Sequence, residues 1–211
     1  MTFLYFDGFP YKPLNPIVFV TKLGLCLSQR SEYPLFMRLT LIAAQSLDGF
    51  ITRHDKPGSD FASEGDRVFF LEALRGFDCC VMGGETYRVS RDAIRASLMP
   101  DRLRIVLTHQ PAIFADDATA GQLEFVNTPP AQLAGDLSKR GFQHCAILGG
   151  AQIHSAFFGA GLVDEVWLTV EPLLFGGGTP LLAGRTSIKL TLLSSEKLAA
   201  STLLLKYRVE K

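Results

Sequence analysis

The stretch CAILGGAQIH, residues 145–154, decides the fold. Residues 145–148 suit a buried strand, two adjacent glycines follow, and residues 151–154 read as the start of a helix. In a parallel sheet, ligands bind beyond the carboxyl ends of the strands, which is where this corner would lie. A helix start there offers free N–H groups to a phosphate, and glycines let the phosphate approach the backbone. A tight turn without a ligand explains the glycine pair equally well, so this motif alone does not distinguish a ligand site from a structural turn.

A second corner repeats the pattern. The stretch VMGGETYR, residues 81–88, has an apolar strand, the pair Gly83 and Gly84, and then Thr86 near a helix start. The Thr86 hydroxyl and nearby N–H groups would bond a second part of the same ligand. A dinucleotide site explains two such corners better than coincidence does, and the corners predict one cleft between them.

The order of elements predicts an α/β domain. Apolar runs alternate with helical patterns up to Gly161, and only strands follow. We expect strands at residues 38–44, 79–82, 104–108, 145–148 and 164–172, and an antiparallel hairpin at 188–198 and 201–210. We expect helices at 63–77, 128–141 and 151–161, and a loop followed by a helix over 83–95. This is a single three-layer α/β domain, with a mostly parallel central sheet, helices on both faces and an antiparallel C-terminal edge.

Local signals mark two helix ends and the domain start. Ser63 with Asp66 resembles a capping box, while Thr128 is placed to cap the helix that Gly141 ends. Residues 37–211 are expected to form the domain, and residues 1–36 an N-terminal extension. The sequence leaves open whether that extension is disordered or a start that the native chain lacks.

Composition narrows the function classes. Basic and acidic residues balance at 21 each, which argues against nucleic-acid binding. The four cysteines include no C-x-x-C pair, and the four histidines are scattered, so we expect no metal and a reducing, cytoplasmic location. The apolar stretch at residues 16–27 is broken by Lys22 and is too short for a membrane span.

Five stretches in order resemble a known family: LTLIAAQSLDGFI (39–51), VMGGETYR (81–88), RIVLT (104–108), ILGGAQIH (147–154) and GLVDEVWLTVEPLLFGGGTPLL (161–182). Over about residues 40–210 the chain resembles the dihydrofolate-reductase-like superfamily. It is most similar to the reductase, C-terminal, domain of the riboflavin-biosynthesis deaminase/reductase and its stand-alone relatives. No deaminase zinc motif is present, so we expect the reductase activity alone.

The resemblance implies NADPH as cofactor, with a cis peptide between Gly149 and Gly150. It implies cofactor contacts at Ala44, Gly83, Gly84, Thr86, Thr108, Gly149, Gly150, Ala151, Gln152 and Ile153. Three departures stand out. Glu85 stands where relatives often have a basic residue, the loop after Thr108 lacks Arg and Lys, and Leu148 replaces a glutamate. Arg88 or Arg91 would have to compensate for a 2′-phosphate, and the riboflavin-pathway substrate is less well supported.

Two carboxylates are the candidate catalytic residues. Asp48 lies in a turn sequence, where it either bonds substrate or orders the loop. The resemblance places a proton-donating acid near Asp66, although a helix N-terminus favours acids in any case. We therefore predict an NADPH-dependent reductase of a small pteridine- or pyrimidine-like heterocycle, with the apolar C-terminal strands forming a homodimer. The alternatives are a non-catalytic nucleotide-binding module and an authentic dihydrofolate reductase, whose usual Trp segment is replaced by residues 54–61.

Overall fold

The computed structural model describes residues 37–211, and the expected N-terminal extension lies outside them. The strands are β1 (Arg38–Ser46), β2 (Cys79–Gly83), β3 (Leu103–Leu107), β4 (Leu123–Val126), β5 (His144–Gly149), β6 (Glu165–Glu171), β7 (Leu190–Lys197) and β8 (Leu203–Val209). The α-helices are α1 (Glu64–Ala73), α2 (Gly84–Ala96), α3 (Pro130–Lys139) and α4 (Ala151–Gly159). Two short 3-10 helices are η1 (Leu74–Gly76) and η2 (Pro111–Asp117).

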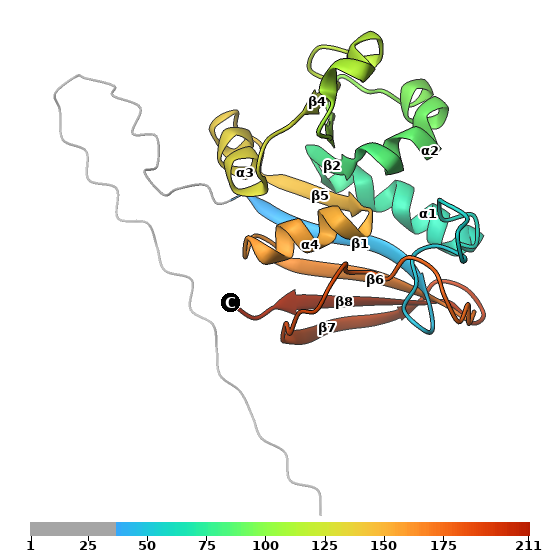
Figure 1. The fold of residues 1–211 in the computed structure, drawn as a ribbon. Helices are drawn as coiled ribbons and strands as arrows, with labels where there is room; N and C mark the ends of the chain where they lie inside the picture. The colour runs from blue at the N-terminus through green and yellow to red at the C-terminus, as the bar shows by residue number, and fades with distance from the viewer. Residues whose placement is uncertain (1–36) are drawn as a thin grey trace, which may run out of the picture. The chain divides into compact units, whose positions relative to one another are not determined.

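The strands form one eight-stranded sheet in the order β4-β3-β2-β5-β1-β6-β8-β7 (Figure 1). The strands from β4 to β6 in this order pair in parallel, and β8 is antiparallel to both of its neighbours. The fold class predicted from the sequence is therefore confirmed, including the closing hairpin. β2, β5 and β1 lie side by side in the middle of the sheet, so their carboxyl ends share one edge.

The two faces of the sheet carry separate cores because side chains alternate along each strand. In β1, Leu39 and Leu41 point to one core, while Ile42 belongs to the other. Helices α3 and α4 cover the first face, and α1 and α2 contribute to the second. The predicted three-layer arrangement follows from this division.

Three local expectations differ from the structure. β4 has only four residues, too few for the apolar pattern to stand out, and was not predicted. Helix α2 begins at Gly84, directly after β2, with no intervening loop. Thr128 does not cap α3, because the N-cap is Pro129 and it makes no side-chain cap bond.

The C-terminal edge strand of the sheet, β7, is exposed and is apolar in its first half. Leu190, Leu192 and Leu193 of β7 are all exposed in the single chain. The homodimer expected from these strands stays a prediction. Among residues 37–211, no helix is long and apolar enough to cross a membrane.

Candidate functional site

The two glycine corners lie next to each other. β2 and β5 are neighbours, and Met82 pairs with Gly149 in the register. A Cβ atom at position 150 would lie 3.7 Å from Thr86 Oγ1, so the second corner faces the first across a van der Waals distance. The peptide between Gly149 and Gly150 is cis, as predicted. The sequence therefore located correctly two corners that share one part of the sheet edge.

Both helix starts at this edge are without a side-chain cap. Gly83 precedes α2 and Gly150 precedes α4, and neither N-cap residue has a side chain that could accept the first-turn N–H groups. By contrast, α1 is capped by Ser63, whose Oγ accepts the Asp66 N–H. Uncapped N–H groups and the positive ends of two helix dipoles favour an anion at this place. The arrangement fits the two phosphates of a dinucleotide.

The four glycines serve two different purposes. A Cβ at Gly83 would lie 3.0 Å from Ile153 Cγ1, and one at Gly149 would lie 3.0 Å from His154 Nε2. Gly149 also has a φ of 107°, which L side chains rarely adopt. Gly84 and Gly150 have ordinary room, with nearest contacts of 3.4 Å and 3.7 Å. Gly149 is thus required by its positive φ and a Cβ at Gly83 would crowd Ile153, whereas Gly84 and Gly150 keep the backbone accessible.

The rim of the first corner carries mixed charge. Glu85 is exposed in the first turn of α2 and forms an ion pair with Arg88 at 3.0 Å. The guanidinium of Arg91 donates two hydrogen bonds to the buried Asp117. Arg91 is therefore already paired and offers this rim no free positive charge. Of the two arginines expected to compensate for Glu85, only Arg88 lies in position, and it is already paired.

The contacts of the other predicted cofactor residues are modest. Thr108 Oγ1 accepts a hydrogen bond from the Gln110 N–H at 3.2 Å and lies against Gly84. Gln152 is exposed on the first turn of α4, while Ala151 is buried. Thr108 thus lies at the first corner, and Ala151 and Gln152 begin the helix at the second.

Ala44 connects the corners to the predicted acid. It lies near the carboxyl end of β1, which runs between β5 and β6, and it pairs with Thr169 in the register. Thr169 is buried with no hydrogen-bond partner within ordinary distance among the described residues. It is close enough to Asp66 to influence that carboxyl. The register places Thr169 on the strand next to Ala44, and Asp66 of α1 lies beside Thr169.

Asp66 is half-buried at the third position of α1. Burial raises the pKa of its carboxyl, the Thr169 hydroxyl opposes this, and the nearby Glu171 carboxylate raises it again. A carboxyl with a raised pKa keeps its proton closer to neutral pH and can act as a general acid. The environment of Asp66 thus suits the role that the sequence predicted.

Asp48 has a different environment. Its carboxylate accepts hydrogen bonds from the Ser46 hydroxyl at 2.6 Å and from the N–H groups of Phe175 and Gly176. These bonds, led by that from Ser46, lower the pKa of Asp48. Of its two predicted roles, the contacts match the ordering of the loop over residues 173–183, and they leave its oxygens occupied.

Three residues near the site were missed by the sequence reasoning. Thr169 and Glu171 are polar side chains on the same face of β6, and His154 is buried in α4. Two polar residues spaced by two at the carboxyl end of a strand are a signal that could have been read. His154 gave no such signal, because a lone histidine on a helix has many explanations.

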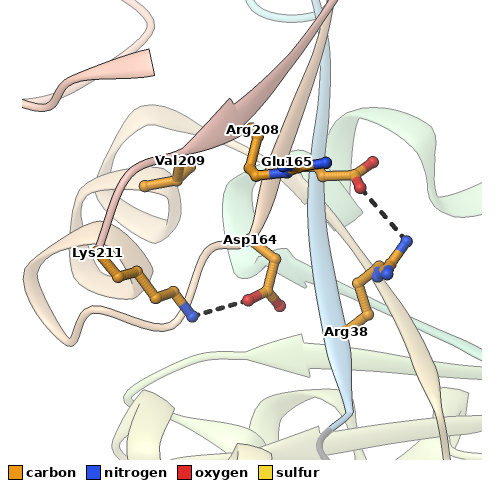
Figure 2. A pocket seen from close by; sticks show the side chains of 6 residues that line it. All are labelled: Arg38, Asp164, Glu165, Arg208, Val209 and Lys211. Atoms are coloured by element: carbon orange, nitrogen blue, oxygen red, sulfur yellow. Dashed lines mark hydrogen bonds and ion pairs between the residues drawn. The ribbon is translucent and has the colours of Figure 1, made fainter. Parts of the chain in front are cut away.

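A separate pocket lies at the other end of the sheet. Figure 2 shows its charged lining, in which Arg38 bonds Glu165 at 3.3 Å and Lys211 bonds Asp164 at 2.7 Å. Its volume is about 260 Å³. Arg38 and Glu165 begin β1 and β6, so this pocket is at the amino ends of the parallel strands, away from the glycine corners. Within residues 37–211, no group of three or more His, Cys, Asp or Glu is placed to hold a metal ion.

The sheet order and the layers define an α/β domain of the dihydrofolate-reductase-like fold. Residues 38–204 match the RibD C-terminal domain family, and the chain belongs to that family. Membership implies an oxidoreductase.

Similar proteins agree with this placement. The uncharacterized protein YwjB of Bacillus subtilis (strain 168) is 27% identical over 161 residues, which cover 72% of this chain and 88% of YwjB. A putative riboflavin biosynthesis protein from Shewanella sp. PV-4 is 25% identical with a TM-score of 0.64, covering 83% of this chain and 100% of that structure. Dihydrofolate reductase from Enterococcus faecalis, complexed with NADP(H), is 18% identical with a TM-score of 0.59, covering 82% and 97%. This last likeness concerns the fold.

Proposed function

We propose that the protein is an NADPH-dependent reductase that transfers a hydride to a small heterocyclic substrate of the pyrimidine or pteridine type. The observation that carries the proposal is the pair of uncapped helix starts, α2 and α4, side by side at the carboxyl edge of the sheet. Family membership and the NADP(H) complex of a protein with the same fold support the choice of cofactor.

NADPH, when bound, supplies the hydride. The N–H groups at Gly84 and at the start of α4 would hold its phosphates, with the Thr86 hydroxyl between the two corners. The small side chain of Ala44 leaves the backbone of β1 open beside the corners, which suits the nicotinamide end. The residues present therefore fit the pyrophosphate well. They fit the 2′-phosphate less well, because Glu85 repels an anion there.

The chain itself contributes mainly the orientation of cofactor and substrate and a proton. Reduction of a C=N or C=O bond needs a proton at the heteroatom as well as the hydride. Asp66 would donate this proton from its partly buried position, and Asp48 would keep the loop over residues 173–183 in place. A general acid of this kind typically contributes about 10²–10⁴-fold to the rate.

The first test measures NADPH binding to the wild-type chain by fluorescence titration. Gly150→Ala and Gly84→Ala add a methyl group that the fold has room for but that obstructs the approach of phosphate. We expect at least about tenfold weaker NADPH binding with the fold intact, because close backbone contact with phosphate is lost. Gly135→Ala in α3 is the matched control, since a Cβ there has nothing within 4 Å and binding should not change.

Turnover separates the remaining alternatives. NADPH oxidation is measured with 7,8-dihydrofolate, a dihydropterin and 5-amino-6-(5-phosphoribosylamino)uracil, the substrate named for a structural neighbour. Turnover of the pterin or the aminouracil supports the proposal. Preference for dihydrofolate with inhibition by antifolates identifies a dihydrofolate reductase, and binding without turnover identifies a nucleotide-binding module. If NADPH does not bind at all, the proposal is wrong.

A further inference from the structure

A second carboxylate lies beside Asp66 and has no place in the chemistry described so far. Glu171, the last residue of β6, is only 2% exposed. Its Oε1 accepts the Ser63 N–H and its Oε2 accepts the Thr202 hydroxyl, both at 2.8 Å. A buried carboxylate with both oxygens accepting hydrogen bonds is a built feature of the fold, since burial without partners would be costly.

The contact with Ser63 changes the way in which α1 is capped. Ser63 is the N-cap, and its Oγ accepts the N–H of Asp66, the third residue of the helix. In a complete capping box, the acid at that third position would in turn accept the N–H of the N-cap residue. Here Glu171 accepts that N–H, so the Asp66 carboxyl is left out of the cap.

We infer that Glu171 is a positioning residue that replaces Asp66 in the helix cap and, by its charge, adds to burial in favouring the proton-bearing form of Asp66. The inference rests on the proposed function, because a proton held on Asp66 has a use only in a reductase. Its physical content, the exchange of cap partners and the effect of one carboxylate on the other, concerns the chain by itself.

The groups around Asp66 support this assignment. Burial raises the pKa of Asp66, and Glu171 from β6 raises it, whereas Thr169 from β6 and Arg67 from α1 lower it. The turn after β7 also packs against α1, where a Cβ at Gly65 would lie 2.7 Å from the Leu198 carbonyl oxygen, but it contributes no charge at this point. Burial is thus the main cause of the raised pKa of Asp66, and Glu171 is the nearby carboxylate that adds to it.

Glu171→Gln tests the inference, because glutamine keeps an oxygen for the Ser63 N–H and removes the charge. The ¹³C resonance of the Asp66 carboxyl, assigned by comparison with Asp66→Asn, is titrated by NMR in the free protein. We expect the pKa of Asp66 to lie above its ordinary value in the wild type and to fall in Glu171→Gln. Glu165→Gln is the matched control: it makes the same change at the other end of β6, where Glu165 bonds Arg38 and Trp167, and it should leave Asp66 unaffected.

The pH profile of turnover supplies the second measurement. With the most active substrate of the panel above, the alkaline limb should move to lower pH, so that Glu171→Gln is about threefold or more slower than wild type at pH 8. A merely structural role would lower the rate equally at all pH values. An unchanged Asp66 titration in Glu171→Gln overturns the inference, whether or not the protein is a reductase.

The two proposals fail in different ways. If the Asp66 titration moves as expected but no panel substrate is reduced, the inference stands and the proposed function does not. If Glu171→Gln does not fold, the wild-type titration decides, since an Asp66 pKa at or below the ordinary aspartate value contradicts the inference.

Discussion

The histidine behind the second glycine corner gives the sharpest prediction about stability. His154 is 1% exposed, its Nδ1 donates to the Leu181 carbonyl oxygen at 2.9 Å, and its Nε2 has no partner among the described residues. Burial lowers its pKa from 6.5 to about 4, although the hydrogen bond to Leu181 acts in the opposite direction. The folded protein thus keeps His154 neutral at pH values where the unfolded chain binds a proton.

The size of the effect follows from the two pKa values. The pKa of His154 is lower in the folded than in the unfolded state. The stability that neutral His154 contributes is therefore fully present above pH 6.5 and is lost as the pH falls toward 4. Proton linkage gives a loss of about 2 kcal/mol in the free energy of unfolding between pH 7.5 and pH 5. For a domain of this size that corresponds to a fall of about 4–8 °C in Tm.

Urea unfolding of wild type and His154→Asn at both pH values measures this difference. Asparagine can still donate to Leu181 but does not titrate, and groups elsewhere affect both proteins alike. We expect wild type to lose about 2 kcal/mol more than His154→Asn between the two pH values. Equal losses in the two proteins would refute the reasoning, because they would mean that His154 is not held neutral by burial.

The remaining predictions concern the acid and the cofactor rim. Asp66→Asn should lower turnover about 10²-fold, by loss of the proton donor. Because burial raises the folded-state pKa of Asp66, the ionised form destabilises the fold as the pH rises, so the same variant should have a higher urea midpoint than wild type at pH 7.5; a lower midpoint would contradict the assignment. Glu85→Lys should raise the preference for NADPH over NADH about three- to tenfold in paired titrations, since it replaces a repelling charge near the expected 2′-phosphate and loses only an exposed pair with Arg88. An unchanged ratio would place the 2′-phosphate elsewhere.

Much of the candidate site could be read from the sequence because its signals are local. Each corner is a strand, two glycines and a helix start within about ten residues, and consecutive elements of this kind place the corners at the carboxyl edge of a parallel sheet. Asp66 was also within reach, since helix starts and the family pattern both point to it. What the sequence did not reveal was the distinction between Gly83 and Gly149, where a side chain would be crowded or strained, and Gly84 and Gly150, which have room for one.

The sequence by itself determined the α/β class, the parallel order of βα units, the closing hairpin and the two glycine corners, because periodicity and turn chemistry act over a few residues. Only the tertiary structure decided which acid is free for chemistry. Glu171 meets Ser63 across 108 residues of chain, and Asp48 meets Phe175 across 127. Hydrogen bonds over such separations depend on sheet register and loop packing, which no local pattern encodes. Those bonds leave the carboxylate of Asp48 occupied and that of Asp66 available.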